Sequence, residues 1–184
     1  KPSLSTLSVT IGKVGTIVNV TEELMSDVAA MGAFVARKAG DRLNYLINTG
    51  ILTGSGAANN MYGILVNGGA KKVITKETGQ AAGTVVNQNL LKMYYGMTAA
   101  DRANGYWLVS DSAEYALAIT TFSGSMLMSK AGDATNPLGN TIFGRPVIVL
   151  PQLAAFGSEA DILFVNLKKY LAVVKGGVNG ATTP

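Results

Sequence analysis

The sequence predicts an α+β protein. Three observations lead to this class. One long segment repeats its apolar residues at helical spacing, several short segments alternate like β-strands, and 22 glycines among 184 residues supply turns between them. A chain of this length can bury a core without disulfides or metals. We therefore expect one large domain or two small ones.

Charged residues are unusually few. Asp, Glu, Lys and Arg make up 14% of the chain, although typical soluble domains contain about 25%. Hydrophobic residues make up 48%. A protein that works alone keeps a charged, mixed surface, which holds its copies apart. The shortage of charge therefore indicates that much of this surface is not meant to face water.

The sequence contains no histidine and no cysteine. This excludes Ser-His-Asp and Cys-His catalysis, disulfides, iron–sulfur clusters and the common zinc sites. We expect no catalytic residues, no metal and no cofactor. No apolar run approaches the roughly 18 residues of a membrane span, so we expect no membrane partner.

The first 20 residues predict extended chain, because apolar residues alternate with small or polar ones. Thr21 then predicts a helix start, since its hydroxyl can cap the first turn. Glu22 and Glu23 would lie at the positive end of the helix dipole. Apolar residues follow at steps of three or four, so we predict a helix over 22–48 that ends at Asn48–Gly50. Its length would be about 40 Å, at about 1.5 Å per residue.

The apolar residues of this helix share one face. We interpret the helix as a rigid spine whose buried face consists of Leu24, Val28, Met31, Val35 and Leu46.

A Gly-, Ser- and Asn-rich loop is predicted over 53–60. The glycines Gly54, Gly56 and Gly63 are candidates for positions whose backbone conformation requires glycine. The Gly-Ser-Gly stretch lacks the lysine of a phosphate-binding loop, and it follows a helix instead of opening one. We interpret it as a helix stop. Residues 61–66 predict extended structure, and 67–87 a surface loop with a strand at 72–75.

The second half of the chain predicts a new unit that begins near Val86. Asn89 is expected to cap a helix that runs through about Arg102, and 106–109 is expected to form a short buried strand. Asp111 is expected to cap the next helix, with Glu114 completing a capping box. The apolar residues of that helix are Tyr115, Leu117 and Ile119.

A polar, Gly-rich loop is predicted over 121–141. Its cluster Met126–Met128 is equally compatible with a protein interface and with local packing. A strand over 142–150 is interrupted at Gly144 and Pro146, which we take as a bend. Proline there favours an edge strand or a strand start at Val147.

The remaining segments predict strands at 162–165 and 170–174, a turn at 166–169 and a mobile end at 176–180.

Two groups of residues allow a chemical reading, and in both cases a structural one is favoured. Asp41 and Asp101 each precede an arginine, which is more typical of solvated ion pairs on helices than of catalytic carboxylates. Four aromatic residues could form a stacking platform, but at this spacing they favour a core. They are Tyr94, Tyr95, Trp107 and Tyr115.

The order of these features resembles that of the major capsid proteins of tailed phages, which share the Hong Kong 97-like fold. Five stretches carry the resemblance: 17–24, 53–56 with 63–65, 106–110, 142–147 and 162–170. Each is weak alone, and together they extend over nearly the whole chain.

This resemblance implies a domain organisation. Residues 1–20 would supply the returning strand of an extended loop and a strand of the peripheral domain. Residues 21–85 would form the peripheral domain around the spine helix 22–48. Residues 86–175 would form the axial domain and closing strands, and 176–184 a mobile tail. Members of the family are longer than this chain, which implies that further segments belong to the protein.

The resemblance also implies a function. The chain would be a structural subunit, not an enzyme, of an icosahedral phage or prophage capsid. Its partners would be copies of itself in pentamers and hexamers, scaffold or portal proteins, and packaged double-stranded DNA bound without sequence specificity. Assembly would take place in the host cytoplasm. The alternatives are an encapsulin-type compartment shell and a small ligand-binding α+β domain.

Overall fold

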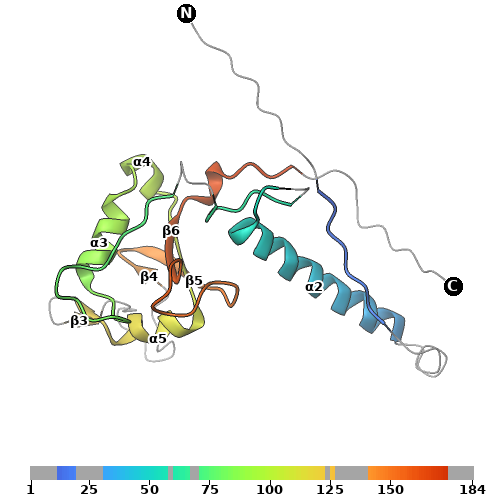
Figure 1. The fold of residues 1–184 in the computed structure, drawn as a ribbon, viewed down its shortest axis with the longest axis horizontal. Coiled ribbons are helices and arrows are strands. Elements are labelled where there is room, and N and C mark those ends of the chain that lie inside the picture. Colours follow the sequence, from blue (N-terminus) through green and yellow to red (C-terminus); the bar gives the residue numbers. More distant parts are fainter. Residues whose placement is uncertain are drawn as a thin grey trace, which may run out of the picture. The chain divides into compact units, whose positions relative to one another are not determined.

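The computed structural model describes residues 12–19, 31–57, 60–66, 71–122, 125–126 and 141–173. The chain divides into two compact units (Figure 1). Unit 1 comprises residues 1–69 and 172–184, and unit 2 comprises residues 70–171. The division follows Gly69, whereas the sequence placed a boundary at 85. The segment before Val86 belongs to unit 2 because Val85 packs against its core.

Helix α2, Met31–Thr53, is the principal element of unit 1 (Figure 1). It continues through Asn48–Gly50, so the predicted end was wrong. Ile51 and Leu52 extend the apolar face past the glycine, and Leu52 is buried. The Thr53 hydroxyl donates to the Thr49 carbonyl oxygen at 3.0 Å. This hydrogen bond adds to the backbone bonds that hold the last turn of the helix. The predicted start at 22 lies outside the described residues.

The remainder of unit 1 contains less strand than the sequence predicts. Residues 12–19 have no regular secondary structure and join no sheet within the described ranges. Ser55 and Tyr62 form an isolated antiparallel bridge, and Ile64–Val66 is a turn instead of the predicted extended segment. The Val66 amide closes the turn by donating to the Gly63 carbonyl oxygen, and the Ile64 and Leu65 amides hold it against the end of α2 by donating to the carbonyl oxygens of Ile51 and Leu52.

Unit 2 begins with a segment in which the strand predicted at 72–75 is absent; these residues are irregular. The single helix predicted over 89–102 is two helices, α3 (Asn87–Tyr95) and α4 (Ala99–Arg102). Gly96 ends α3, and Thr98 starts α4 by donating its hydroxyl to the Asp101 carboxylate at 2.7 Å. Asn89 lies inside α3, where its side chain accepts from the Val86 amide at 3.2 Å.

Strand β1, Tyr106–Val109, is confirmed as a short buried strand. Helix α5, Asp111–Ile119, follows it. The N-cap is Ser110, not Asp111, and its side chain accepts from the Ala113 amide. The buried residues of α5 are Ala113 and Leu117, so the core position favoured for Tyr115 was wrong; the apolar Ile119 is exposed too. They lie outside because the helix turns about 100° per residue, which places them away from Leu117.

The central sheet has the order β4-β5-β1-β6. Its other strands are β4 (Thr141–Ile142), β5 (Arg145–Val149) and β6 (Ile162–Val165). β1 pairs in parallel with β5 and antiparallel with β6. The predicted edge position of β5 was wrong, since β4 pairs with its first two residues and β1 with its last three. Pro146 therefore pairs only with β4, one residue before the ladder to β1 begins.

Smaller elements complete unit 2. Where a loop was predicted, β2 (Thr121–Phe122) and β3 (Ser125–Met126) form a short hairpin. A 3₁₀ turn, η1 (Leu167–Lys169), follows β6. Residues 170–173 do not form the predicted strand, and residues 174–184, with the predicted tail, lie outside the described residues. No helix among the described residues is long and apolar enough to cross a membrane.

The core of unit 2 lies between the sheet and the helices α3 and α5. Its largest fully buried side chain is Trp107, and the cluster also includes Leu90, Leu117 and Ile142. Helices that come before and after β1 in the sequence thus contribute to one core with the sheet.

Candidate assembly surface

Large apolar side chains are exposed on both helices of unit 2 that cover the core. Tyr95 at the end of α3 is 68% exposed, and Tyr115 and Ile119 on α5 are 73% and 61% exposed. An exposed aromatic ring is worth little to a monomer, whereas tyrosine is enriched in the centres of protein interfaces. These side chains are candidates for contacts between copies.

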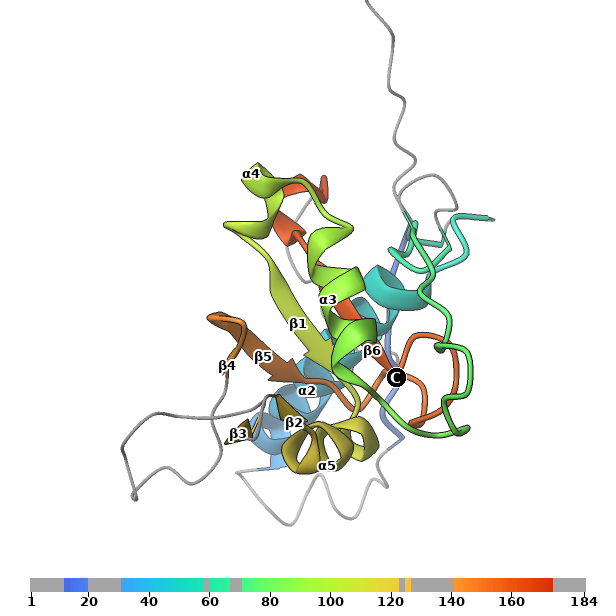
Figure 2. The same cartoon turned by 90° about the vertical axis from the view of Figure 1, so that its left-hand side faces the viewer.

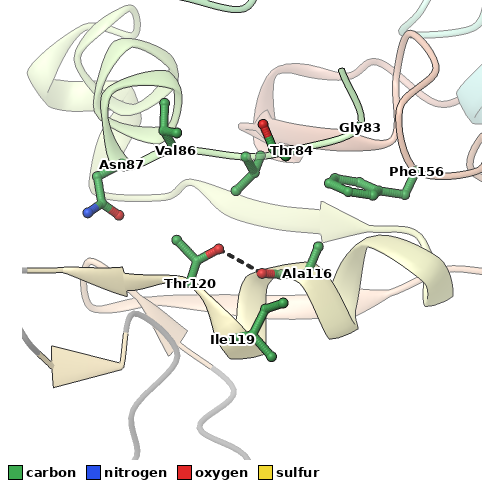
Figure 3. Close-up of a pocket in the computed structure, with 9 residues that line it drawn as sticks. Gly83, Thr84, Val86, Asn87, Ala116, Ile119, Thr120 and Phe156 are labelled. Carbon is green, nitrogen blue, oxygen red and sulfur yellow. Dashed lines mark hydrogen bonds between the residues drawn. The ribbon is translucent and has the colours of Figure 1, made fainter. Parts of the chain in front are cut away.

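A shallow hollow of about 390 Å³ opens beside α5 (Figure 3). The loop 83–87, the end of α5 and Phe156 form its walls. The Thr120 hydroxyl on its wall donates to the Ala116 carbonyl oxygen at 2.7 Å (Figure 3). None of the residues that line it is ionisable. The hollow therefore offers shape and apolar surface but no acid, base or nucleophilic carboxylate.

A polar cluster joins α4 to the end of β6. The Asp101 carboxylate accepts from Lys169 at 2.8 Å, from the Thr98 hydroxyl at 2.7 Å and from the Asn166 amide at 2.9 Å. The hydrogen bond from Lys169, followed by that from Thr98, lowers the pKa of Asp101 below its ordinary value. Asp101 is thus a structural carboxylate that fixes the η1 turn against α4.

The neighbouring Arg102 does not pair with Asp101 as the sequence suggested. Its guanidinium lies over the Tyr94 and Tyr95 rings, with its central carbon 5.3 and 4.9 Å from their centroids. The ion pair of Asp101 is formed with Lys169 instead. On a short helix adjacent residues point to different sides, so residues 101 and 102 meet different partners.

The aromatic residues divide between core and surface. Trp107 and Tyr94 are core residues, stacked with Phe164 at centroid distances of 4.5 and 5.4 Å. Tyr95 and Tyr115 are exposed. Of the four aromatic residues for which the sequence favoured a core position over a stacking platform, two are therefore core residues.

The candidate glycines of unit 1 lie where the chain doubles back after α2. A Cβ on Gly54 would meet the carbonyl oxygens of Met61 and Gly50, and one on Gly63 would lie 2.8 Å from the Leu52 carbonyl oxygen. Gly56 has φ +68°, and a Cβ there would meet the Tyr62 ring. The two chain segments that meet here, the end of α2 with residues 54–56 and residues 61–63, lie too close together to leave room for a side chain.

The candidate bend at Gly144 and Pro146 is a two-residue hairpin between β4 and β5. Its central residues, Phe143 and Gly144, have φ of 51° and 70°. Positive φ at both central positions is the mark of a type I′ turn, whose twist matches that of the strands. Phe143 holds this conformation while its ring packs against Tyr94 at 5.6 Å.

The candidate spine residues are only partly placed. Met31, Val35 and Leu46 are half-buried along one face of α2, and most residues between them are exposed. Leu24 and Val28 lie outside the described residues, as do the last two residues of the Met126–Met128 cluster. Asp41 is exposed on α2.

The described residues contain no group of three acidic, His or Cys side chains that could hold a metal ion. The Asp101 cluster is the feature that sequence reasoning missed. Its members lie 65 and 68 residues apart along the chain, and no local pattern connects them.

Comparison with known proteins identifies the chain's relatives. The profile of the Phage capsid family matches residues 1–183. No curated protein matches. Among solved structures, one titled "Capsid of empty GTA particle computed with C5 symmetry" is similar with a TM-score of 0.60 and 15% identity, over 85% of this chain and 56% of that one. The corresponding capsid of the native GTA particle is similar with a TM-score of 0.60 and 14% identity, over 84% and 55%.

The chain thus spans a little more than half the length of the capsid chains it resembles. Their shared architecture is the α+β arrangement of helices around a mixed sheet. The family profile covers nearly every residue of the sequence. The chain belongs to the phage capsid family and has the Hong Kong 97-like fold.

Proposed function

We propose that this protein is the structural subunit of an icosahedral phage or prophage capsid, which assembles from pentamers and hexamers around double-stranded DNA. The observation that carries the proposal is the family match over residues 1–183. The low charge of the chain and the exposed aromatic and aliphatic side chains of α3 and α5 support it. Permanent interfaces between copies are more apolar than ordinary surface.

The proposal gives two parts of the chain distinct roles, with a domain boundary at 85 that lies inside unit 2, residues 70–171. Residues 21–85, around the long helix, form the peripheral domain, and 86–175 form the axial domain and closing strands. Residues 1–20 supply the returning strand of the extended loop. In α2, Met31, Val35 and Leu46, together with Leu24 and Val28 before it, keep the subunit rigid, and the close contacts at Gly54 and Gly63 fix the turn after α2.

The proposed partners are copies of the chain, scaffold or portal proteins, and DNA bound through its phosphates without sequence specificity. Assembly in the host cytoplasm precedes incorporation into the virion. The hollow beside α5 does not favour a ligand-binding enzyme, because it is open and none of its lining residues is ionisable.

Electron microscopy of the complete protein, expressed alone and with its neighbouring genes, tests this proposal. Closed shells or rings with five- or six-fold symmetry are the expected result. A protein that stays a monomer at high concentration under both conditions would contradict it. Particles that enclose an enzyme instead of DNA would favour the encapsulin-type alternative.

A further inference from the structure

Four cationic side chains gather at the end of unit 2 where β1 begins and β6 ends. Pairing of Tyr106 with Val165 brings these two strand ends together. The cations come from α4, from the first residue of β5 and from η1, and they are Arg102, Arg145, Lys168 and Lys169. We call this set, with Asp101, the basic end.

Most of the charge at the basic end is not neutralised locally. Arg145 donates to the Ala103 carbonyl oxygen at 2.7 Å, and Lys168 donates to the Asn104 side-chain oxygen at 2.5 Å. Both acceptors are uncharged. Only Lys169 pairs with a carboxylate, that of Asp101. Four cations against one carboxylate leave a net charge of +3.

Four acidic side chains gather at the opposite end of β1. Val109 pairs with Ile162, and the Ser110 amide donates to the Asp161 carbonyl oxygen at 3.0 Å. This pairing brings the start of α5 beside the segment before β6. The carboxylates are Asp111, Glu114, Glu159 and Asp161. With Lys71, which pairs with Glu159, they form the acidic end, whose net charge is −3.

Unit 2 is therefore electrically polar along β1. Helices α4 and α5, which carry parts of the two ends, lie at opposite ends of the unit in both views (Figures 1 and 2). The other described charges of unit 2 lie on α3 and the segment before it; they are Lys72, Lys76, Glu77 and Lys92. In a sequence so poor in charge, sorting four acids and four bases to opposite ends calls for an explanation beyond solubility.

We infer that copies of unit 2 associate head to tail, with the basic end of one copy against the acidic end of the next. This inference rests on the proposed shell function and names the contact within it. Head-to-tail contacts are heterologous, and they close into a ring when the rotation between copies allows it. Complementary charge selects this pairing and its orientation over head-to-head contact, in which like charges would meet.

The exposed members of each end can reach a neighbouring copy. Lys168 and Lys169 are exposed at the basic end, and Asp111 and Glu159 are exposed at the acidic end. A nucleic acid is a poorer candidate for the partner of these surfaces. It would neutralise the basic end but would leave the acidic end, which carries an equal and opposite charge, without a partner. A second copy satisfies both ends at once.

Salt dependence is the first test. Raising NaCl from 0.1 to 1 M shortens the screening length from about 10 to about 3 Å. We expect the protein concentration at half-assembly, followed by sedimentation velocity on the complete chain, to rise about tenfold or more. A concentration that stays constant or falls over this range would overturn the inference.

Charge reversal is the second test. The variant K168E/K169E gives the basic end a net charge of −1, and D111K/E159K gives the acidic end a net charge of +1. Alone, each variant brings like charges together, so half-assembly should need at least tenfold more protein. Mixed in equal amounts, the two should form six-membered rings in alternation, because every contact then joins opposite charges; a five-membered ring cannot alternate. The double reversal K72E/K76E, at two exposed lysines outside both ends, should assemble like the wild type.

Rescue in the mixture also shows that both variants are folded. Because K169E would face Asp101, the variant K168E/K169Q provides a milder change whose glutamine can still donate to that carboxylate. It should weaken assembly without unfolding. Rings or shells of the single variants at wild-type concentration would refute the head-to-tail contact and leave the capsid function intact. Failure of the wild type to assemble at any salt concentration would instead refute the proposed function itself.

Discussion

The Trp107 indole nitrogen donates a hydrogen bond to the Ile142 carbonyl oxygen at 3.1 Å, which joins β1 to β4 across the intervening strand β5. Both residues are fully buried and lie 35 positions apart. One side chain thus ties together three strands of the sheet.

Replacing Trp107 with Phe should destabilise the protein by about 2–4 kcal/mol, because the substitution leaves a cavity and a buried carbonyl oxygen without its donor. Urea unfolding followed by circular dichroism measures the change. Tyr115→Phe is the matched control on an exposed aromatic and should change the free energy of unfolding by less than about 0.5 kcal/mol. Equal effects of the two substitutions would contradict the assigned role of Trp107.

Alanine at Gly63 should destabilise the protein by about 1–3 kcal/mol or more, since its Cβ would press against the backbone of residues 52–54. Gly40 in α2 provides the opposite case, because a Cβ there meets nothing within 4 Å. Gly40→Ala should stabilise the helix by about 0.5–1 kcal/mol. Thermal unfolding of both variants checks the signs, and a stabilised Gly63→Ala protein would refute the close contact.

Gly144 has open space around it, so its substitution tests backbone conformation alone. Gly144→Ala should cost about 1–2 kcal/mol, because a left-handed conformation is strained for residues with a Cβ. Gly144→Asn should cost less, since asparagine tolerates that conformation. Unfolding free energies should follow the order Gly, Asn, Ala. A variant with alanine as stable as the one with asparagine would exclude the I′ turn.

Acid should weaken the Asp101 cluster. The folded-state pKa of Asp101 is lowered, first by the hydrogen bond from Lys169, so the cluster stabilises the fold above the unfolded-state value of about 3.9. That stabilisation is lost as the pH falls through the folded-state pKa. The free energy of unfolding, measured between pH 6 and 3, should therefore fall more steeply for the wild type than for Asp101→Asn.

Lys169→Met should also reduce this acid sensitivity, because it removes the largest cause of the lowered pKa. Lys76→Met, which removes an exposed lysine outside the cluster, should leave the slope unchanged. A wild-type slope shared by Asp101→Asn and Lys169→Met would show that the cluster does not contribute.

Aspartate at Val35 should disrupt folding or assembly, because this half-buried position lies on the apolar face of α2. Ala36→Asp introduces the same charge at the neighbouring exposed position and should be tolerated. Particle yield by sedimentation, together with the thermal midpoint, separates loss of assembly from loss of folding. Normal particles from Val35→Asp would remove this face from the spine.

Local patterns were reliable where a segment depends on its own residues. The apolar periodicity located α2, and the run Tyr-Trp-Leu-Val located β1. The ends of the helices depended also on contacts with other parts of the chain. Helix α2 passed its predicted end because Leu52 occupies a buried position. The helix expected over 89–102 is interrupted because α3 ends at Gly96 and the Thr98 hydroxyl, hydrogen-bonded to Asp101, starts α4.

The position of β5 illustrates what local patterns miss. Pro146 predicted either an edge strand or a strand start at Val147, and its missing N–H is compatible with the partial pairing observed, in which the ladder to β1 begins at Val147. The I′ turn at Phe143 and Gly144 folds β4 back along the same strand, however, and so makes β5 an inner strand. A phenylalanine at positive φ is not predictable from local preference, since the packing of its ring on Tyr94 and Trp107 compensates for the strain.

The sequence by itself determined the fold class, the absence of histidine and cysteine chemistry, and the shortage of charge, because each depends on composition or on spacing along one segment. Only the tertiary structure decided which residues meet across long separations: Asp101 with Lys169 and Asn166, Trp107 with Ile142, and the sorting of charge to the two ends of β1. Such contacts depend on strand order and register, which bring together side chains that no pattern within a single segment relates.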